Sequence, residues 1–142
     1  MKEPAERMIL VVCTGNTCRS PMAAALFRRA LQEREEPFRV VSAGLAATGE
    51  PASEGARQAM AEWGIDLAAH RSQPVTAELC RQAERIYVMS PWQGQAVQAA
   101  FGVPEERIRL LGDGIPDPFG GDAELYRRTR DALEQAIRKE KI

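Results

Sequence analysis

The sequence lacks the features that mark membrane proteins and nucleic-acid-binding proteins. Its 142 residues contain no run of about 18 apolar residues, the length that a membrane-spanning helix requires. Its 19 basic and 20 acidic residues give a net charge of −1, so no excess of positive charge indicates a nucleic acid or an anionic membrane as a partner. We therefore expect neither nucleic acid nor membrane among its partners.

Cysteine and histidine are also scarce, with three cysteines and one histidine in the chain. The cysteines are odd in number and lack zinc-ligand spacing, so the sequence favours neither a disulfide framework nor a structural metal site. We expect no metal and no cofactor. The polar segment Met1–Arg7 and the short apolar stretch Met8–Cys13 do not resemble a secretory signal, which indicates a cytoplasmic protein.

The length corresponds to one domain, which can bury about 70% of the surface that an unfolded chain exposes. No internal repeat, low-complexity tract or long linker divides the sequence. We expect a monomer with a single domain over residues 1–142, in which residues 1–7 form a polar extension.

Short apolar runs alternate along the chain with longer amphipathic segments. This pattern predicts strands over residues 8–12, 38–42, 85–89 and 108–111, and helices over residues 20–34, 53–63, 76–82, 91–101 and 123–139. Alternating strands and helices indicate β-α-β units. The predicted fold is α/β, a four-stranded parallel sheet with helices on both faces, like the three-layer Rossmann and flavodoxin sandwiches.

Two polar loops, Thr14–Arg19 and Gly112–Gly121, follow the first and the last predicted strands. Ligands of parallel sheets bind beyond the carboxyl ends of the strands, where both loops should lie. In the first loop, Cys13 ends a strand, five residues separate it from Arg19, and a helix is predicted to begin at Ser20-Pro21. The Cys–Arg spacing alone is weak evidence, but the strand before it and the helix after it make this segment a candidate catalytic loop.

Each part of this loop suits the binding of an anion beside a nucleophile. A loop that curls into a helix N-terminus can aim backbone N–H groups at one point, and Gly15 permits the backbone conformations that this requires. The same positive field lowers the pKa of a cysteine, which predicts a thiolate at Cys13 near neutral pH. Arg19 offers a planar fork to two phosphoryl oxygens, and the Ser20 hydroxyl is close enough in sequence to donate to the sulfur.

The segment V-C-T-G-N-T-C-R-S-P-M-A resembles the signature loop of the low-molecular-weight protein tyrosine phosphatase family. Four further motifs follow in that family's order and approximate spacing: Ser42-Ala43-Gly44, His70-Arg71-Ser72, Val88-Met89 and Asp117-Pro118-Phe119-Gly120. The resemblance covers residues 8 to 139. It implies a four-stranded parallel sheet and a two-step phosphatase mechanism through a phosphocysteine, acting on phosphorylated proteins.

The resemblance also implies roles for single residues. The loop residues Thr14, Gly15, Asn16, Thr17, Cys18 and Arg19 would bind phosphate, and Asp117 would be the general acid and then the base. Asp113 and Asp122 are weaker candidates, because solvated loop or helix-cap carboxylates are common. His70 would support the loop by hydrogen bonding to Asn16, and Ser42 resembles a member of the same supporting shell. Phe119 is expected either to wall the pocket or to pack in the core.

The resemblance suggests that Cys18 can form a reversible disulfide with Cys13 under oxidation, which would protect the thiolate. The alternative is that Cys18 is an inert small residue. Cys80 is expected to be inert core.

Thr17 stands where tyrosine-directed members of the family usually carry Ile or Leu. Two features resemble the protein arginine phosphatase subgroup: a Thr at this position, and the sequence D-P-F-G-G followed by Y-R-R-T-R-D. A hydroxyl favours a polar guanidinium and is poorly paired against a phenyl ring. We predict a protein arginine phosphatase, with a protein tyrosine phosphatase as the alternative.

Two rival functions fit the sequence less well. Arsenate reductases of this fold use two further cysteines, whereas this chain has only Cys80 without a second cysteine near it. A non-catalytic module that binds phosphoproteins would be expected to lack the nucleophile or the acid, and this chain has both Cys13 and Asp117.

Overall fold

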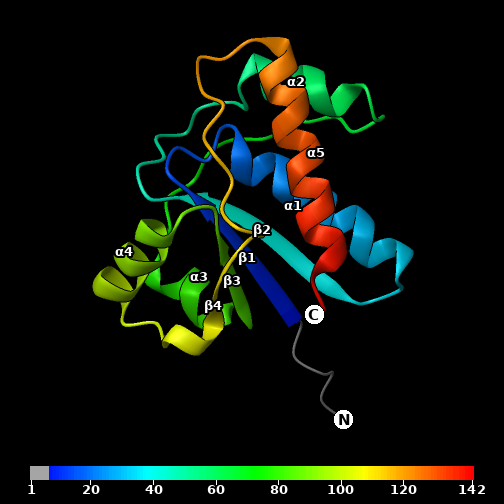
Figure 1. The fold of residues 1–142 in the computed structure, drawn as a ribbon. Coiled ribbons are helices and arrows are strands. Elements are labelled where there is room, and N and C mark those ends of the chain that lie inside the picture. Colours follow the sequence, from blue (N-terminus) through cyan, green and yellow to red (C-terminus); the bar gives the residue numbers. More distant parts are fainter. Residues whose placement is uncertain (1–6) are drawn as a thin grey trace.

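The structure, a computed structural model, describes residues 7–142 (Figure 1). Its elements, in chain order, are β1 (Arg7–Cys13), α1 (Arg19–Glu33), β2 (Phe38–Gly44), α2 (Glu54–Ala61), α3 (Ala77–Gln82), β3 (Arg85–Val88), α4 (Pro91–Phe101), a 3₁₀ turn (Glu105–Arg107), β4 (Ile108–Leu110) and α5 (Ala123–Lys139). Of the predicted polar extension, residues 1–6 lie outside the described part. Its last residue, Arg7, begins β1.

The four strands form one sheet in the order β2-β1-β3-β4, and every neighbouring pair is parallel. Helices α1, α2 and α5 supply the buried residues on one face, and α3 and α4 supply those on the other (Figure 1). The predicted α/β sandwich with helices on both faces is therefore confirmed. No helix within residues 7–142 has both the length and the apolarity that crossing a bilayer requires.

The central strand β1 is an apolar run because both of its faces are covered. Its side chains alternate between the two cores: Ile9 and Val11 pack with α1 and α5, whereas Leu10 and Val12 pack with α3 and α4. All four are fully buried. The strand is thereby fixed in position, and its last residue, Cys13, emerges at the carboxyl edge of the sheet.

The helix starts follow capping chemistry. Ser53, Thr76 and Asp122 each accept a hydrogen bond from the backbone N–H three residues further on, at the starts of α2, α3 and α5. Helix α1 begins one residue earlier than predicted, at Arg19, with Cys18 at its N-cap. Ser20 and Pro21 therefore lie inside the first turn, where a proline costs no intrahelical hydrogen bond.

Candidate active site

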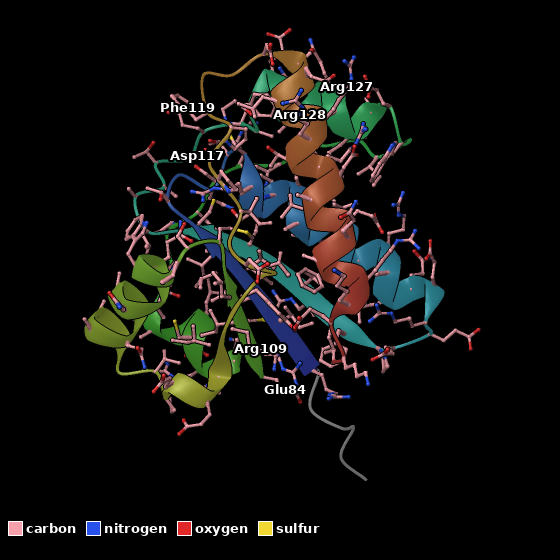
Figure 2. All side chains as sticks on the ribbon, in the orientation of Figure 1. Glu84, Arg109, Asp117, Phe119, Arg127 and Arg128 are labelled. Atoms are coloured by element: carbon pink, nitrogen blue, oxygen red, sulfur yellow. The ribbon has the colours of Figure 1, made fainter. Side chains whose placement is uncertain are left out.

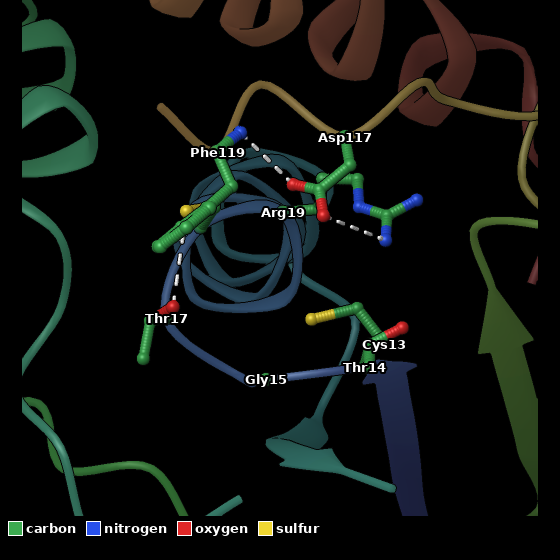
Figure 3. Close-up of a pocket in the computed structure, with 8 residues that line it drawn as sticks. Cys13, Thr14, Gly15, Thr17, Arg19, Asp117 and Phe119 are labelled. Carbon is green, nitrogen blue, oxygen red and sulfur yellow. Dashed lines mark hydrogen bonds and ion pairs between the residues drawn. The ribbon is translucent and has the colours of Figure 1, made fainter. Parts of the chain in front are cut away.

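The two loops that the sequence selected meet at the carboxyl edge of the sheet. They line a cavity of about 220 Å³ whose walls are Cys13, Thr14, Gly15, Thr17, Cys18, Arg19, Asp117 and Phe119 (Figure 3). Asp117 and Phe119 lie on the segment before α5, above this edge, whereas Glu84 and Arg109 lie at the opposite end of the sheet (Figure 2). The structure thus brings together the predicted nucleophile, cation and acid.

Five backbone carbonyls between Cys13 and Cys18 accept hydrogen bonds from groups outside this loop. Their donors are the backbone N–H groups of residues in neighbouring segments and one imidazole nitrogen: Leu45 N to Cys13 O (3.0 Å), Ala46 N to Thr14 O (2.8 Å), His70 Nε2 to Asn16 O (2.7 Å), Ser53 N to Thr17 O (2.9 Å) and Met22 N to Cys18 O (3.3 Å). Five carbonyls are therefore held facing away from the cavity.

A trans peptide points its N–H opposite to its C=O. The carbonyl contacts consequently turn the next N–H groups, those of Thr14, Gly15, Thr17, Cys18 and Arg19, toward the cavity. Within residues 7–142 these five amides donate no hydrogen bond to another protein group. Such a set of convergent, unpaired amides at a helix N-terminus is an anion-binding cradle.

The cradle can form only because strand β2 passes directly beneath it. A Cβ atom on Gly44, the last residue of β2, would lie 2.7 Å from the Thr14 carbonyl oxygen and 2.9 Å from Asn16. Any other residue would push the loop away, so glycine is required at this position for steric reasons.

Asn16 is the residue that turns the loop, with a left-handed φ of 57° that its short polar side chain tolerates. Its Nδ2 donates to Ser20 Oγ at 2.7 Å, and its Oδ1 accepts from the backbone N–H of Gln73 at 3.0 Å. His70 holds its carbonyl, as the resemblance implied. Asn16 is completely buried, so these contacts fix a single loop conformation.

Ser42 contacts this region through its carbonyl, which accepts from Gln73 Nε2 at 3.0 Å. Its place in the supporting shell stays a prediction. Gln73, which the sequence did not single out, joins β2 to Asn16. Its main contribution is a backbone N–H, which no side-chain motif could reveal.

The Cys13 thiol lies 2.8 Å from Ser20 Oγ, and the Asn16 amide donates to its sulfur at 3.3 Å. Burial is the largest influence and raises the pKa of Cys13, while Ser20, the Asn16 amide and the Arg19 guanidinium act to lower it. The expectation of a lowered pKa is therefore wrong for the structure as it stands. The residue is 3% exposed, and the loss of solvation outweighs the favourable contacts.

We expect Ser20→Ala to raise the pKa of Cys13 further, because the variant removes the strongest of the contacts that favour the thiolate. The thiolate fraction at pH 7 falls, and the pH midpoint of alkylation by iodoacetamide moves to higher pH. Thr129→Val is the matched control, since the Thr129 hydroxyl donates to Leu125 within its own helix. An unchanged or lowered midpoint in Ser20→Ala would contradict this account.

Arg19 is buried beside the cavity and is held at one end. Its Nη1 donates to the carbonyl of Ile115 at 2.8 Å, and its Nη2 lies 3.8 Å from Asp117 Oδ2 (Figure 3). The carbonyl contact sets the plane of the guanidinium, so the fork is oriented before any anion is bound.

Asp117 lies at the mouth of the cavity with its side chain half exposed, at 51%. Its Oδ1 accepts from the backbone N–H of Phe119 at 3.0 Å, which orients the carboxylate (Figure 3). Phe119 itself is 74% exposed and lines the cavity, so the structure supports the wall position and not the core position. Asp122, by contrast, caps α5.

Cys18 is buried and contacts two hydroxyls that the sequence did not select. Its thiol donates to Ser53 Oγ at 3.3 Å and lies 3.4 Å from the Tyr126 hydroxyl. Burial raises the pKa of Tyr126 to about 12, so this phenol is neutral at physiological pH. These contacts join the loop to the starts of α2 and α5. A disulfide between Cys18 and Cys13 stays a prediction, since both thiols are free in the structure.

No group of three or more His, Cys, Asp or Glu side chains within the described residues is arranged to hold a metal ion. The positive character of the site comes from the backbone amides and Arg19.

Comparisons with known proteins agree with this geometry. The family described as low molecular weight phosphotyrosine protein phosphatase matches residues 8–140. A protein-arginine-phosphatase of Geobacillus stearothermophilus is 42% identical over 139 residues, which cover 91% of this chain and 90% of the relative. A probable low-molecular-weight protein-tyrosine-phosphatase, EpsP of Ralstonia nicotianae, is 39% identical over 136 residues, with coverage of 92% and 86%.

Among solved structures, the arginine phosphatase YwlE, in a mutant with a phosphorylated active-site serine, superimposes with a TM-score of 0.88. It shares 36% identity, and the match covers 92% of this chain and 91% of that one. A parallel α/β sandwich with a cysteine beneath an amide cradle defines a cysteine-dependent protein phosphatase. The chain belongs to the low-molecular-weight phosphotyrosine protein phosphatase family.

Proposed function

We propose that this chain is a protein arginine phosphatase that works through a phosphocysteine. The observation that carries the proposal is the cradle: five inward-facing amides and a buried guanidinium surround the space above one cysteine sulfur. This arrangement can hold three phosphoryl oxygens and stabilise the charge that they carry in the transition state.

In the first step, the Cys13 thiolate attacks phosphorus and a sulfur–phosphorus bond forms. The bond between phosphorus and the guanidine nitrogen breaks, and Asp117 gives its proton to that nitrogen. In the second step, Asp117 accepts a proton from water, whose oxygen attacks the phosphocysteine. The sulfur leaves as a thiolate, inorganic phosphate departs, and the enzyme is restored.

The choice of phosphoarginine rests on the rim of the cavity and on the relatives. Thr17 lines the cavity and is only half buried, with its Oγ1 3.8 Å from Cys18 Sγ (Figure 3). A rim with a hydroxyl at Thr17 and a carboxylate at Asp117 suits a polar, cationic group better than a phenyl ring. Phosphorylated proteins are the proposed partners, since arginine phosphatases and tyrosine phosphatases are both among the relatives.

The direct test is a comparison of kcat/KM on phosphoarginine and phosphotyrosine peptides of the same sequence. We expect phosphoarginine to be the better substrate. The reverse preference would contradict the proposal and favour the tyrosine phosphatase.

We expect Thr17→Ile to move the preference toward phosphotyrosine by about 10-fold or more. The variant replaces a polar contact with an apolar one worth about 1–3 kcal/mol to a phenyl ring. The ratio of the two kcat/KM values is the measurement, and Thr17→Ser, which keeps the hydroxyl, is the control that should leave it nearly unchanged. A ratio that stays constant in Thr17→Ile would show that Thr17 does not select the substrate.

Arsenate reduction is not proposed, because it would need a cysteine relay. Cys80 packs in the core under α3 and α4, whereas Cys13 and Cys18 pack in the core on the other face of the sheet. A disulfide could not pass from one to the other without unfolding the sheet.

We also propose that the enzyme acts as a monomer of one domain in the cytoplasm. The nucleophile, the guanidinium, the acid and the cradle amides all belong to this chain, so one copy supplies every group that the proposed mechanism uses. Light scattering on the active protein tests the proposed monomer. A dimer that loses activity on dilution would contradict it.

A further inference from the structure

Gln93 is a completely buried polar residue to which neither the sequence nor the proposed mechanism gives a role. It is the third residue of α4. Its Oε1 accepts from the backbone N–H groups of Met89 (2.8 Å) and Ser90 (3.1 Å). Its Nε2 donates to Thr14 Oγ1 at 3.3 Å. One side chain therefore joins the end of β3, the start of α4 and the first residue after the nucleophile.

The two accepted bonds have an ordinary structural explanation. A Glu or Gln at the third helical position often reaches back to the N-cap backbone. Glutamate would serve that purpose equally well, but a carboxylate has no N–H to donate to Thr14. It would also place a negative charge beside a cavity built for an anion. The bond to Thr14 is thus the contact that capping does not account for.

Thr14 is held from both sides of β1. Its carbonyl accepts from Ala46, which follows β2, while its hydroxyl accepts from Gln93, which follows β3. These two contacts set the orientation of the peptide between Thr14 and Gly15, whose N–H faces the cavity. Without the Gln93 contact, the bond from Ala46 would be the one hydrogen bond among the described residues that holds Thr14 itself.

We propose that Gln93 is a positioning residue for phosphoryl transfer. It acts through Thr14 to keep the first amides of the cradle aimed at the phosphoryl oxygens, and this alignment matters most in the transition state. The inference rests on the proposed phosphatase function, but not on the choice between phosphoarginine and phosphotyrosine.

The test is a double-mutant cycle with Thr14→Val, Gln93→Met and the double variant, with Thr14→Ser as the conservative control. Thr14→Val removes only the hydroxyl that Gln93 contacts and leaves the two capping bonds in place. The loss of those capping bonds in Gln93→Met is the same with either residue at position 14, so it cancels in the coupling. The readouts are kcat and KM on p-nitrophenyl phosphate and the dissociation constant of vanadate by calorimetry.

We expect Thr14→Val to lower kcat about 3- to 10-fold with little change in KM, and to weaken vanadate binding in parallel. Thr14→Ser, which keeps the hydroxyl, should recover most of the activity that Thr14→Val loses. The double variant should be about as active as Gln93→Met alone, because the shared contact is lost only once.

Losses that multiply in the double variant would overturn the proposal. So would vanadate affinities that stay native in both single variants, since a merely structural Gln93 would change only the thermal midpoint. If the native protein cleaves p-nitrophenyl phosphate but not phosphoarginine, the arginine function fails while the cycle still decides the role of Gln93. If neither substrate is cleaved, the vanadate dissociation constants of the native protein and the three cycle variants alone decide whether Gln93 is a positioning residue.

Discussion

Cys13→Ser is expected to lower kcat on phosphoarginine and on p-nitrophenyl phosphate by about 10⁴-fold or more, the scale seen when a catalytic nucleophile is removed. Serine has nearly the same shape, so the cradle and the contact with Ser20 remain. Its hydroxyl, however, is far less ionised than a thiol and is a poor leaving group in the second step. We therefore expect slow phosphorylation of the serine, visible by mass spectrometry as one added phosphoryl group.

The cradle of Cys13→Ser should still bind vanadate, because the amides and Arg19 are unchanged. Vanadate binding therefore distinguishes a variant that has lost catalysis from one that has lost the anion-binding site. Cys80→Ala is the matched control: Cys80 is buried in the core on the other face of the sheet, so activity should be retained. Activity within 10-fold of native in Cys13→Ser would exclude Cys13 as the nucleophile.

Most of the fold could be predicted from the sequence. The bounds of α4 and α5 agree with the prediction, and the strands differ by two residues or fewer at each end. These elements had clear signals: Ser90-Pro91 and Gly102 around one helix, and Asp122 as the cap of the other. The 3₁₀ turn at Glu105–Arg107 was missed, since three polar residues in a loop carry no periodic pattern.

The side chains of the site could be predicted because they are chemically distinctive, but the groups that orient the loop could not. The N–H groups of Leu45, Ala46 and Ser53 hold its carbonyls, and any residue type except proline supplies such a donor. The signal in the sequence was Gly44, which only the structure explains as the point where β2 passes under the loop.

The pKa of Cys13 was predicted in the wrong direction for a related reason. The motif shows which groups favour a thiolate, and all of them are present around the sulfur. It does not show how deeply the sulfur is buried, and burial outweighs them. Ser20 is the largest of the contacts that act against burial, which is why Ser20→Ala is the variant expected to show this balance.

The contacts of Asp117 place the general acid. Its Oδ2 lies 3.8 Å from the Arg19 guanidinium, and its Oδ1 accepts from the Phe119 amide. These contacts hold the carboxyl group at the mouth of the cavity, where both proton transfers of the proposed mechanism take place.

Asp117→Asn is expected to lower kcat on phosphoarginine about 10²- to 10⁴-fold, the usual contribution of a general acid. The amide keeps the shape of the carboxylate and can still accept from Phe119, but it has no acidic proton for the guanidine nitrogen. The loss should be smaller on p-nitrophenyl phosphate, whose leaving group departs readily as an anion. The measurement is the loss of kcat on phosphoarginine divided by the loss of kcat on p-nitrophenyl phosphate. Asp113→Asn is the control, because Asp113 does not line the cavity. Equal losses on the two substrates would mean that Asp117 does not protonate the leaving group, and the site would then need another acid.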